Sequence, residues 1–137
     1  MRGIRRRDLA PDLAAAYAAF QRCAEHVDLA QRAMIRCVPS SPRSLPLPLE
    51  VGAETLEVSL AAARAELAGW RHPQVEAEWQ TCAAALTETA AGVSGAVAVA
   101  AGTSELEVAL TAVQDLLDPL HAFVDAERRF ADLRRGR

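Results

Sequence analysis

Four apolar stripes with alternating spacings of three and four residues constrain the fold of this chain more than any other feature. The clearest stripe runs without interruption through Leu49, Ala53, Leu56, Leu60, Ala63, Leu67 and Trp70. On an α-helix this spacing puts every member on one face, which must be buried against another apolar face. The chain has 137 residues, enough to bury a core, and its abundance of Ala, Leu, Arg and Glu favours helix throughout.

Proline and glycine residues divide the chain into four expected helices. The segment Pro39–Pro48 contains four prolines and cannot be helix, so we expect a stiff, extended connection there, held against the helices by Leu45, Leu47 and Leu49. The helices are expected at about Leu9–Val38, Glu50–Ala68, Pro73–Ala101 and Ser104–Arg134.

Residues with known preferences for helix ends mark these boundaries. Asp8 is a plausible N-cap of the first helix, and Gly69 is the natural C′ residue of the second. Ser104-Glu-Leu-Glu107 has the pattern of a capping box for the fourth. Because the apolar rhythm continues across Pro119, we expect a kink there rather than an end.

These elements predict an all-α fold, an up-down-up-down four-helix bundle that forms a single domain over 1–137. The bundle would consist of two αα-hairpins, 8–69 and 73–134. Gly52–Ala62 aligns with Gly102–Ala112 at an offset of 50, and Pro11–Tyr17 aligns with Pro73–Trp79 at an offset of 62. Duplication of one hairpin would explain these matches, and so would chance similarity between Ala- and Leu-rich helices.

Charge is unevenly distributed along the chain. The ends, 1–7 and 128–137, hold nine Arg and one Asp, a net charge of +8, whereas the middle carries −11 and the whole chain −3. The total argues against a generally basic nucleic-acid-binding protein. The basic termini form a candidate electrostatic patch, or they are solvated tails, and its residues are Arg5, Arg6, Arg7, Arg128, Arg129, Arg134 and Arg135.

Cysteine usage and the N-terminus favour a cytoplasmic location. Three Cys without a C-x-x-C pair are typical of reduced, buried thiols. Asp8, Pro11 and Asp12 interrupt what would otherwise resemble a signal peptide. The uncharged run 89–104 is too weakly apolar for a transmembrane segment, and the exclusive use of Arg over Lys is typical of a GC-rich bacterial genome.

No residue set predicts catalysis, a cofactor or a metal. Asp118-x-x-His121, with Asp115 and Asp125, has a composition suited to metal binding, but helix geometry turns Asp118 and Asp125 toward solvent. Cys23-x-x-His26 with Cys82 is a second conceivable metal set, for which the simpler interpretation is two buried thiols and a boundary histidine. His72 precedes Pro73 in a turn and is expected to be exposed, with a weak capping role.

The strongest functional indication is the outer face of the third helix. From Thr89 to Ser104 it carries no charge, although an exposed helix face normally carries Glu and Arg. A stripe of small residues would let another helix approach closely, in a homo-oligomer such as a dimer or with a helical protein partner. Alanine bias on a solvated face would give the same pattern, and so would a face covered by the proline-rich connection. The predicted interface residues are Ala84, Ala91, Ser94, Gly95 and Ala98.

The stretch Leu49–Ala101, with Gly69-Trp70 at its turn, is slightly similar to the helical hairpins of WXG-type secreted proteins, which have Trp-x-Gly there. The order of the two residues differs here, the similarity covers under half the chain, and the three Cys depart from the pattern. We therefore expect a non-enzymatic helical interaction or scaffold protein. Two alternatives are a ligand-binding or catalytic bundle with a pocket between the hairpins, and a secreted helical-hairpin partner protein. A cavity between the first and third helices near Cys23 and Cys82 would be the most informative observation.

Overall fold

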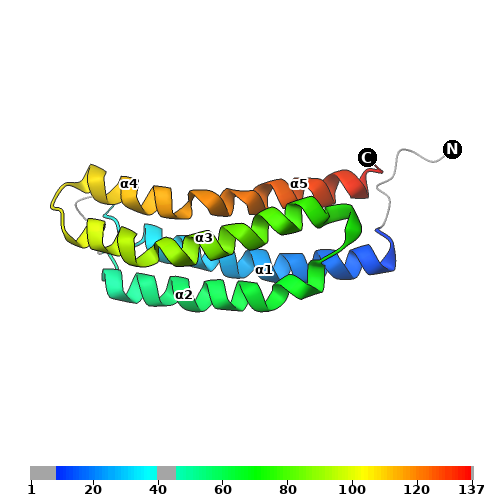
Figure 1. Ribbon diagram of the computed structural model, residues 1–137, viewed down its shortest axis with the longest axis horizontal. Coiled ribbons are helices and arrows are strands. Elements are labelled where there is room, and N and C mark those ends of the chain that lie inside the picture. Colours follow the sequence, from blue (N-terminus) through cyan, green and yellow to red (C-terminus); the bar gives the residue numbers. More distant parts are fainter. Residues whose placement is uncertain (1–8, 40–45, 137) are drawn as a thin grey trace.

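The computed structural model describes residues 9–39 and 46–136, in which every regular element is helical. Long helical stretches run side by side (Figure 1). They are α1 (Pro11–Ile35), α2 (Leu49–Glu66) with η1 (Leu67–Trp70), η2 (Pro73–Val75) with α3 (Glu76–Ala101), and α4 (Leu106–Leu117) continued by η3 (Asp118–His121) into α5 (Ala122–Arg134). The prediction of an all-α fold from four helical stretches is confirmed.

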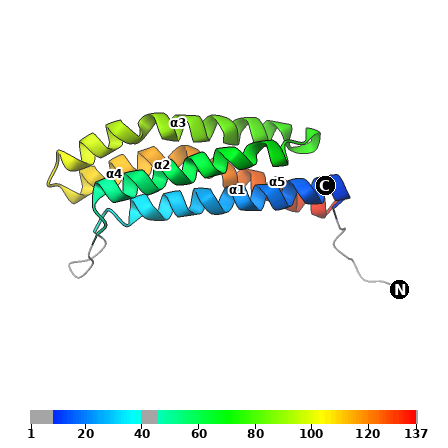
Figure 2. The same cartoon turned by 90° about the horizontal axis from the view of Figure 1, so that it is seen from below.

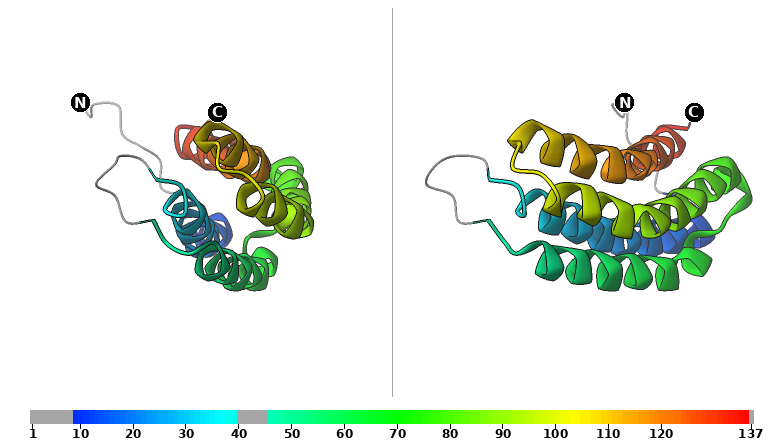
Figure 3. Two further views of the ribbon diagram at one scale, coloured as in Figure 1. Left: turned by 90° about the vertical axis from the view of Figure 1, so that its left-hand side faces the viewer. Right: turned by 60° about the vertical axis from the view of Figure 1, so that its left-hand side comes forward.

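Helices that follow one another in the chain are also neighbours in space. α1 packs most extensively against α2, and α3 packs against α4 and α5, while α2 also contacts α3. By contrast, the backbones of α1 and α4 come close at few positions. Figures 2 and 3 show the four stretches around a shared interior, with the start of α1 and the end of α5 at the same end of the molecule.

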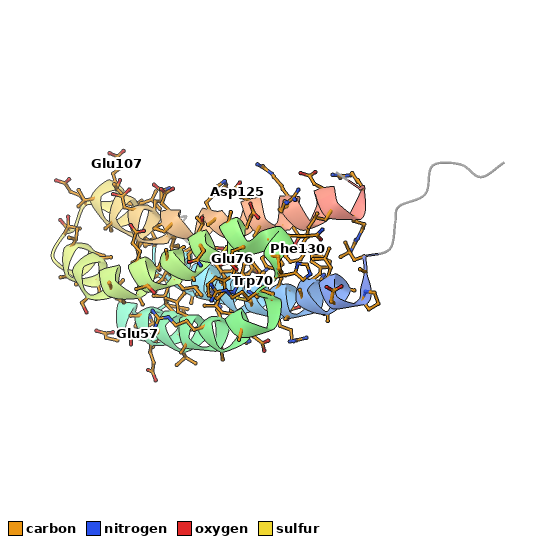
Figure 4. The ribbon with its side chains drawn as sticks, turned by 45° about the vertical axis from the view of Figure 1, so that its right-hand side comes forward. Glu57, Trp70, Glu76, Glu107, Asp125 and Phe130 are labelled. Carbon is orange, nitrogen blue, oxygen red and sulfur yellow. The ribbon has the colours of Figure 1, made fainter. Side chains whose placement is uncertain are left out.

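The interior is organised around Trp70, which is fully buried. Its ring lies edge-on to Phe20 of α1 at a centroid distance of 5.0 Å, and the centroids of Phe123 and Phe130 lie 6.4 and 6.3 Å away. Figure 4 shows Trp70 and Phe130 directed into the interior. Because edge-on and tilted ring pairs are favourable and aromatic rings bury much apolar area, this cluster ties α1, η1 and α5 together.

Both ends of α1 differ from those expected. The helix begins at Pro11 with Ala10 in the N-cap position, and Asp8, the expected cap, lies outside the described residues. Pro11 is well suited to this place because its missing N–H would have no helical partner there. α1 ends at Ile35 rather than Val38, since Pro39 disfavours helical backbone in the residue before it.

The described parts of the proline-rich connection lie against the helices, as predicted. Leu47 donates its N–H to the carbonyl oxygen of Arg36 at 2.9 Å, which holds the chain to the end of α1. Leu47 and Leu49 are half-buried. Leu45, the third residue expected to make such a contact, lies outside the described residues.

Gly69 does not have the left-handed C′ conformation predicted for it. It lies within η1, and Gly136 is the one glycine with positive φ among the described residues. A Cβ atom added at Gly69 would lie 2.9 Å from the Cβ of Ala19. The absent side chain therefore allows η1 to approach α1 closely, and this approach brings the neighbouring Trp70 into the core.

The start of the fourth helical stretch also departs from prediction, whereas its kink is as expected. The capping box Ser104–Glu107 is not formed: α4 begins at Leu106, and the hydroxyl of Thr103 accepts the Glu105 N–H at 3.0 Å. At Pro119 the chain passes through the 3-10 turn η3 into α5. Pro119 lacks an N–H and its ring crowds the preceding turn, so the α-helix cannot run through unchanged.

The two internal sequence matches differ in whether the matched residues have similar burial and similar positions in their helices. At the offset of 50, Leu56 and Leu60 are buried in α2, but their counterparts Leu106 and Leu110 are exposed at the start of α4. At the offset of 62, by contrast, the proline of each pair occupies a first-turn position, and the aliphatic residue two positions later is buried in both. Similarity in sequence therefore corresponds to similarity in environment at only one of the two offsets.

Gly52 provides a test of the packing between α1 and α2. Replacing it with Ala is expected to lower the free energy of unfolding by about 1–3 kcal/mol, because the added methyl group would overlap the Sγ of Cys37. Urea denaturation followed by circular dichroism measures this change.

Gly95→Ala is the matched control, since an added Cβ there meets nothing within 4 Å. It should keep or raise stability, by up to about 1 kcal/mol. Cys37→Ala combined with Gly52→Ala should recover part of the loss. Equal urea midpoints for Gly52→Ala and Gly95→Ala would contradict the described contact.

Candidate interaction face and inter-hairpin groove

The five predicted interface residues form a stripe, here called the seam, on the solvent side of α3. Ala84, Ala91, Ser94, Gly95 and Ala98 are all exposed. The opposite side of α3 is buried, with Cys82, Ala85, Leu86, Thr89 and Val93 in the core. The helical period that puts one set inside thus puts the other set outside, and the position of the seam agrees with the prediction.

A shallow groove of about 310 Å³ runs beside the seam, between α3 and α4. Gly92, Gly95 and Val99 line it from α3, and Ala112 lines it from α4. A Cβ added at Gly92 would lie 3.2 Å from a methyl carbon of Leu116, so this glycine lets the two helices approach. The small residues of α3 therefore serve two purposes, since Gly92 packs within the protein while Gly95 faces open space.

Exposed apolar side chains continue this surface onto the start of α4. Val99, Leu106 and Val108 are 49%, 50% and 39% exposed. The apolar spacing of the fourth helical stretch, Leu106, Leu110, Val113, Leu117, Leu120 and Val124, predicts one buried stripe. The structure exposes three of its members, Leu106, Leu110 and Val124. The apolar stripe on this stretch is instead buried at Val113, Leu116, Leu117, Leu120, Phe123 and Phe130. The apolar outer surface is thus broader than the predicted seam.

The charges around this surface are all of one sign. Between Arg71 and Arg128 the sequence has no Arg or Lys, and it has nine carboxylates. Glu88 and Asp115 line the groove beside the seam. Figure 4 shows Glu107 and Asp125 pointing away from the interior. The outer face of α3 and α4 is therefore a small-residue and apolar surface with acidic borders.

The arginines of the predicted electrostatic patch that the structure describes mostly have partners within the protein. Arg128 pairs with Asp125 at 3.7 Å, and Arg135 pairs with Asp132 at 3.4 Å. Arg129 donates to the carbonyl oxygen of Gln74, and the guanidinium of Arg134 lies 5.0 Å from the ring centroid of Tyr17. Arg5, Arg6 and Arg7 lie outside the described residues. A role in binding an anionic partner stays a prediction.

The carboxylates and histidine of the second hairpin do not gather at one place. Asp115 lines the groove between α3 and α4, whereas Asp118 and His121 line a different groove beside α1. Asp125 pairs with Arg128. Among residues 9–39 and 46–136, no three side chains of His, Cys, Asp and Glu are grouped so as to hold a metal ion.

The cysteines are buried thiols. The Sγ of Cys23 donates to the carbonyl oxygen of Ala63 at 3.2 Å. Burial raises the pKa of Cys23 to about 11, partly offset by the nearby indole of Trp70. Burial, and secondarily the nearby Cys23, raises the pKa of Cys82 to about 12. Such thiols are protonated at neutral pH, which is unfavourable for nucleophilic catalysis and for metal ligation.

His72 is less exposed than predicted and does act as a cap. Its Nδ1 accepts the Gln74 N–H at 3.1 Å, at the start of η2. Its Nε2 lies 2.9 Å from a carboxylate oxygen of Asp12, and this hydrogen bond lowers the pKa of Asp12. Both ring nitrogens are therefore engaged in fixing the turn against the start of α1, so His72 has a structural role.

One surface was missed by the sequence analysis: an open groove of about 550 Å³ between α1 and the α4–η3–α5 stretch. It lies between the two hairpins, with α1 on one side and the second hairpin on the other. This groove differs from the space between α1 and α3 near Cys23 and Cys82, whose two side chains are fully buried. Its lining includes Phe20 and Ala24 of α1 together with Asp118, His121 and Glu127.

The chain matches no protein-family model, no curated protein and no solved structure.

The stretch Pro73–Ala101 is long and apolar enough to cross a membrane by length and composition, a property that core helices of soluble proteins share. In its most apolar 18-residue window, 28% of the residues are buried within the protein. The uncharged run 89–104 alone is too weakly apolar for a transmembrane segment, whereas the full helical stretch meets these criteria. The low buried share reflects the exposed seam.

Burial of the thiols predicts slow chemical modification. In the native protein at pH 8, Cys23 and Cys82 should resist iodoacetamide, because both are fully buried and the thiolate is the reacting form. In 6 M guanidinium chloride all three cysteines should react quickly. Peptide mass spectrometry at timed intervals distinguishes the sites, and fast native labelling of Cys23 would contradict the described burial.

The same raised pKa values predict a loss of stability in alkaline solution. An unfolded thiol ionises near its ordinary pKa of 9.0, whereas the folded thiols stay protonated up to about pH 11. The stabilisation is thus complete below pH 9 and is lost as the pH rises toward the folded pKa values. Cys23→Ala/Cys82→Ala should show a flatter fall in urea midpoint above pH 9, and an identical pH profile would exclude this origin.

Proposed function

We propose that this protein is a non-enzymatic helical interaction or scaffold protein that associates through the Ala- and Gly-rich outer face of α3. The partner is a second copy, giving a homo-oligomer such as a dimer, or another helical protein. We place it in a bacterial cytoplasm, on the grounds of its reduced-thiol cysteine usage and its Arg-biased composition.

The observation that carries the proposal is the lack of charge on an exposed helix face. Ala91, Ser94 and Ala98 face solvent, yet no charged residue lies between Glu88 and Glu105. Contiguous apolar surface of this kind is unusual on a monomeric protein and marks sites of association. Small side chains let the backbone of a second helix come close, so that many weak packing contacts form along its length.

The acidic borders favour a partner with basic side chains. Glu88 and Asp115 carry negative charge beside the seam. The second hairpin has no Arg between residues 72 and 127 that could neutralise this charge. A copy that docked with the same face would bring carboxylates together, which costs free energy. A copy that docked with an Arg-bearing surface, or a partner helix with Lys or Arg beside an apolar stripe, would satisfy both features.

We also infer that the four helical stretches form an up-down-up-down bundle. Helices adjacent in sequence pack against each other, and the short segments 67–75 and 102–105 link α2 to α3 and α3 to α4. This order supports the division into hairpins 8–69 and 73–134 within one domain. An origin by hairpin duplication has support at the offset of 62 and none at the offset of 50.

A second function has one observation in its favour. The groove between α1 and α4–η3–α5 lies where two hairpins meet, as the ligand-binding alternative requires. The secreted-hairpin alternative stays a prediction.

Charge placed in the seam tests the first proposal. Ala91→Glu and Gly95→Glu are each expected to shift the mass measured by light scattering from that of an oligomer to about 14.7 kDa, because a buried unpaired carboxylate opposes association. Ala61→Glu, on an exposed position of α2, is the matched control. If the mass and the set of bound partners are the same for all three variants and the parent protein, the seam is not an interface.

A further inference from the structure

The groove between α1 and the α4–η3–α5 stretch has the size of a ligand site. Its volume of about 550 Å³ lies within the range of roughly 300–1,000 Å³ that holds small organic molecules. It is on a different face from the seam of α3, so what binds there is independent of the association proposed above.

Side-chain size explains why the groove exists. Phe20 of α1 stacks on Phe123 of α5 at a centroid distance of 6.2 Å and lies 5.1 Å from Phe130. These rings stand between the two helices and hold them apart. One turn farther along α1 the facing residue is Ala24, whose methyl group cannot fill the width that the rings set. The difference in size between Phe20 and Ala24 therefore explains the groove, and no helix has to move to open it.

The floor and the rim of the groove differ in polarity. Phe20, Leu120 and Phe123 are buried residues that present an apolar floor. The side chains of Asp118 and His121 on the rim make no hydrogen bond or ion pair within the described part of the chain. The carboxylate of Glu127 accepts the hydroxyl of Tyr17 at 2.7 Å, which fixes its position.

The charged side chains that line the groove are carboxylates, and the guanidinium of Arg134 lies farther out, 5.0 Å from the ring centroid of Tyr17. Asp118 and Glu127 line the groove, and no Arg does. Two arginines of the flanking helices pair elsewhere, Arg32 with Asp28 at 2.9 Å and Arg128 with Asp125 at 3.7 Å. A cation entering the groove would therefore meet two carboxylates, which attract positive charge, above a floor of buried apolar side chains.

We propose that this groove binds an organic cation with an elongated apolar body. The charged end lies beside Asp118 and Glu127, and the body lies over Phe20, Leu120 and Phe123. Burial of the body supplies the non-specific part of the affinity. The carboxylates supply the preference for a cation over a neutral or anionic molecule of the same shape.

Three probes that share one body test the preference. Octyltrimethylammonium, 1-octanol and octanoate, below their aggregation concentrations, are titrated by calorimetry at pH 7 and low salt. The cation should bind at least about tenfold more tightly than octanoate, with octanol between them, since the two carboxylates attract the cation and repel octanoate. Added NaCl should reduce the preference. Equal affinity for the cation and octanoate would overturn the proposal.

Variants that neutralise carboxylates test whether Asp118 and Glu127 cause the preference for the cation. Asp118→Asn/Glu127→Gln should bring the cation to the affinity of octanol, while the amide oxygen introduced at position 127 can still accept the Tyr17 hydroxyl. Glu88→Gln/Asp115→Asn makes the same change in net charge at the groove beside the seam, and the preference should be retained. If both double variants lower the preference equally, the charge effect is not local to the groove and the proposal fails.

A space-filling variant locates the apolar body. Ala24→Leu should abolish binding of all three probes, whereas Ala18→Leu, at an exposed position of the same helix, should not. Circular dichroism establishes that both variants are folded. Retention of binding by Ala24→Leu would overturn the proposal. Ala91→Glu should leave probe binding unchanged, so this test and that of the α3 seam succeed or fail separately.

Discussion

The packing of Trp70 against Phe20, Phe123 and Phe130 is the interaction on which the rest of this structure depends. Trp70 belongs to a 3-10 turn rather than to a helix face, and Gly69 lets that turn approach α1 closely enough for the indole to enter. The indole ring of Trp70 then fills the interior near the end of the molecule at which α1 begins and α5 ends. The indole N–H has no hydrogen-bond partner among the described residues, although Trp usually finds one when buried.

The aromatic cluster also sets the spacing of the helices around it. Where rings separate α1 from α5 the interior is full, and where Ala24 follows them a groove remains. On the other side of α1 small residues pack closely against α2, since a methyl group at Gly52 would overlap Cys37. α1 therefore packs closely against α2 and lies farther from α5. The sizes of the side chains between the helices determine both distances.

The sequence was sufficient to predict the features that depend on periodicity within one segment. The four helical stretches, the seam of α3 and the burial of Cys23 and Cys82 all follow from which residues recur every three or four positions. Even Trp70 was placed on the core stripe of its helix correctly, although the helix had already become a 3-10 turn at that point.

The failed predictions depend on contacts between segments. Periodicity shows that Leu106 and Leu110 share a face, but it does not show whether a neighbouring helix extends far enough to cover that face. The groove depends on the relative sizes of Phe20 and Ala24 and of the residues opposite them, which a single helical pattern does not contain. Gly69 was assigned to a helix end from local preference, whereas a tertiary approach to Ala19 decides its conformation. At these positions, tertiary packing determines the structure and overrides the local sequence preferences.

The two ends of the molecule differ in side-chain size and in charge. The bulky aromatic residues of the core lie toward the end where α1 begins and α5 ends, and the arginines of α5 are there too. The other end of α3 and the start of α4 have Ala, Gly, Val and Leu with carboxylates and no Arg. Since this end has few large side chains to bury, its apolar surface stays partly exposed, with Leu106 half exposed. A partner that covers it would supply the apolar contacts that the chain lacks there, so association and folding would be stabilised by the same kind of burial.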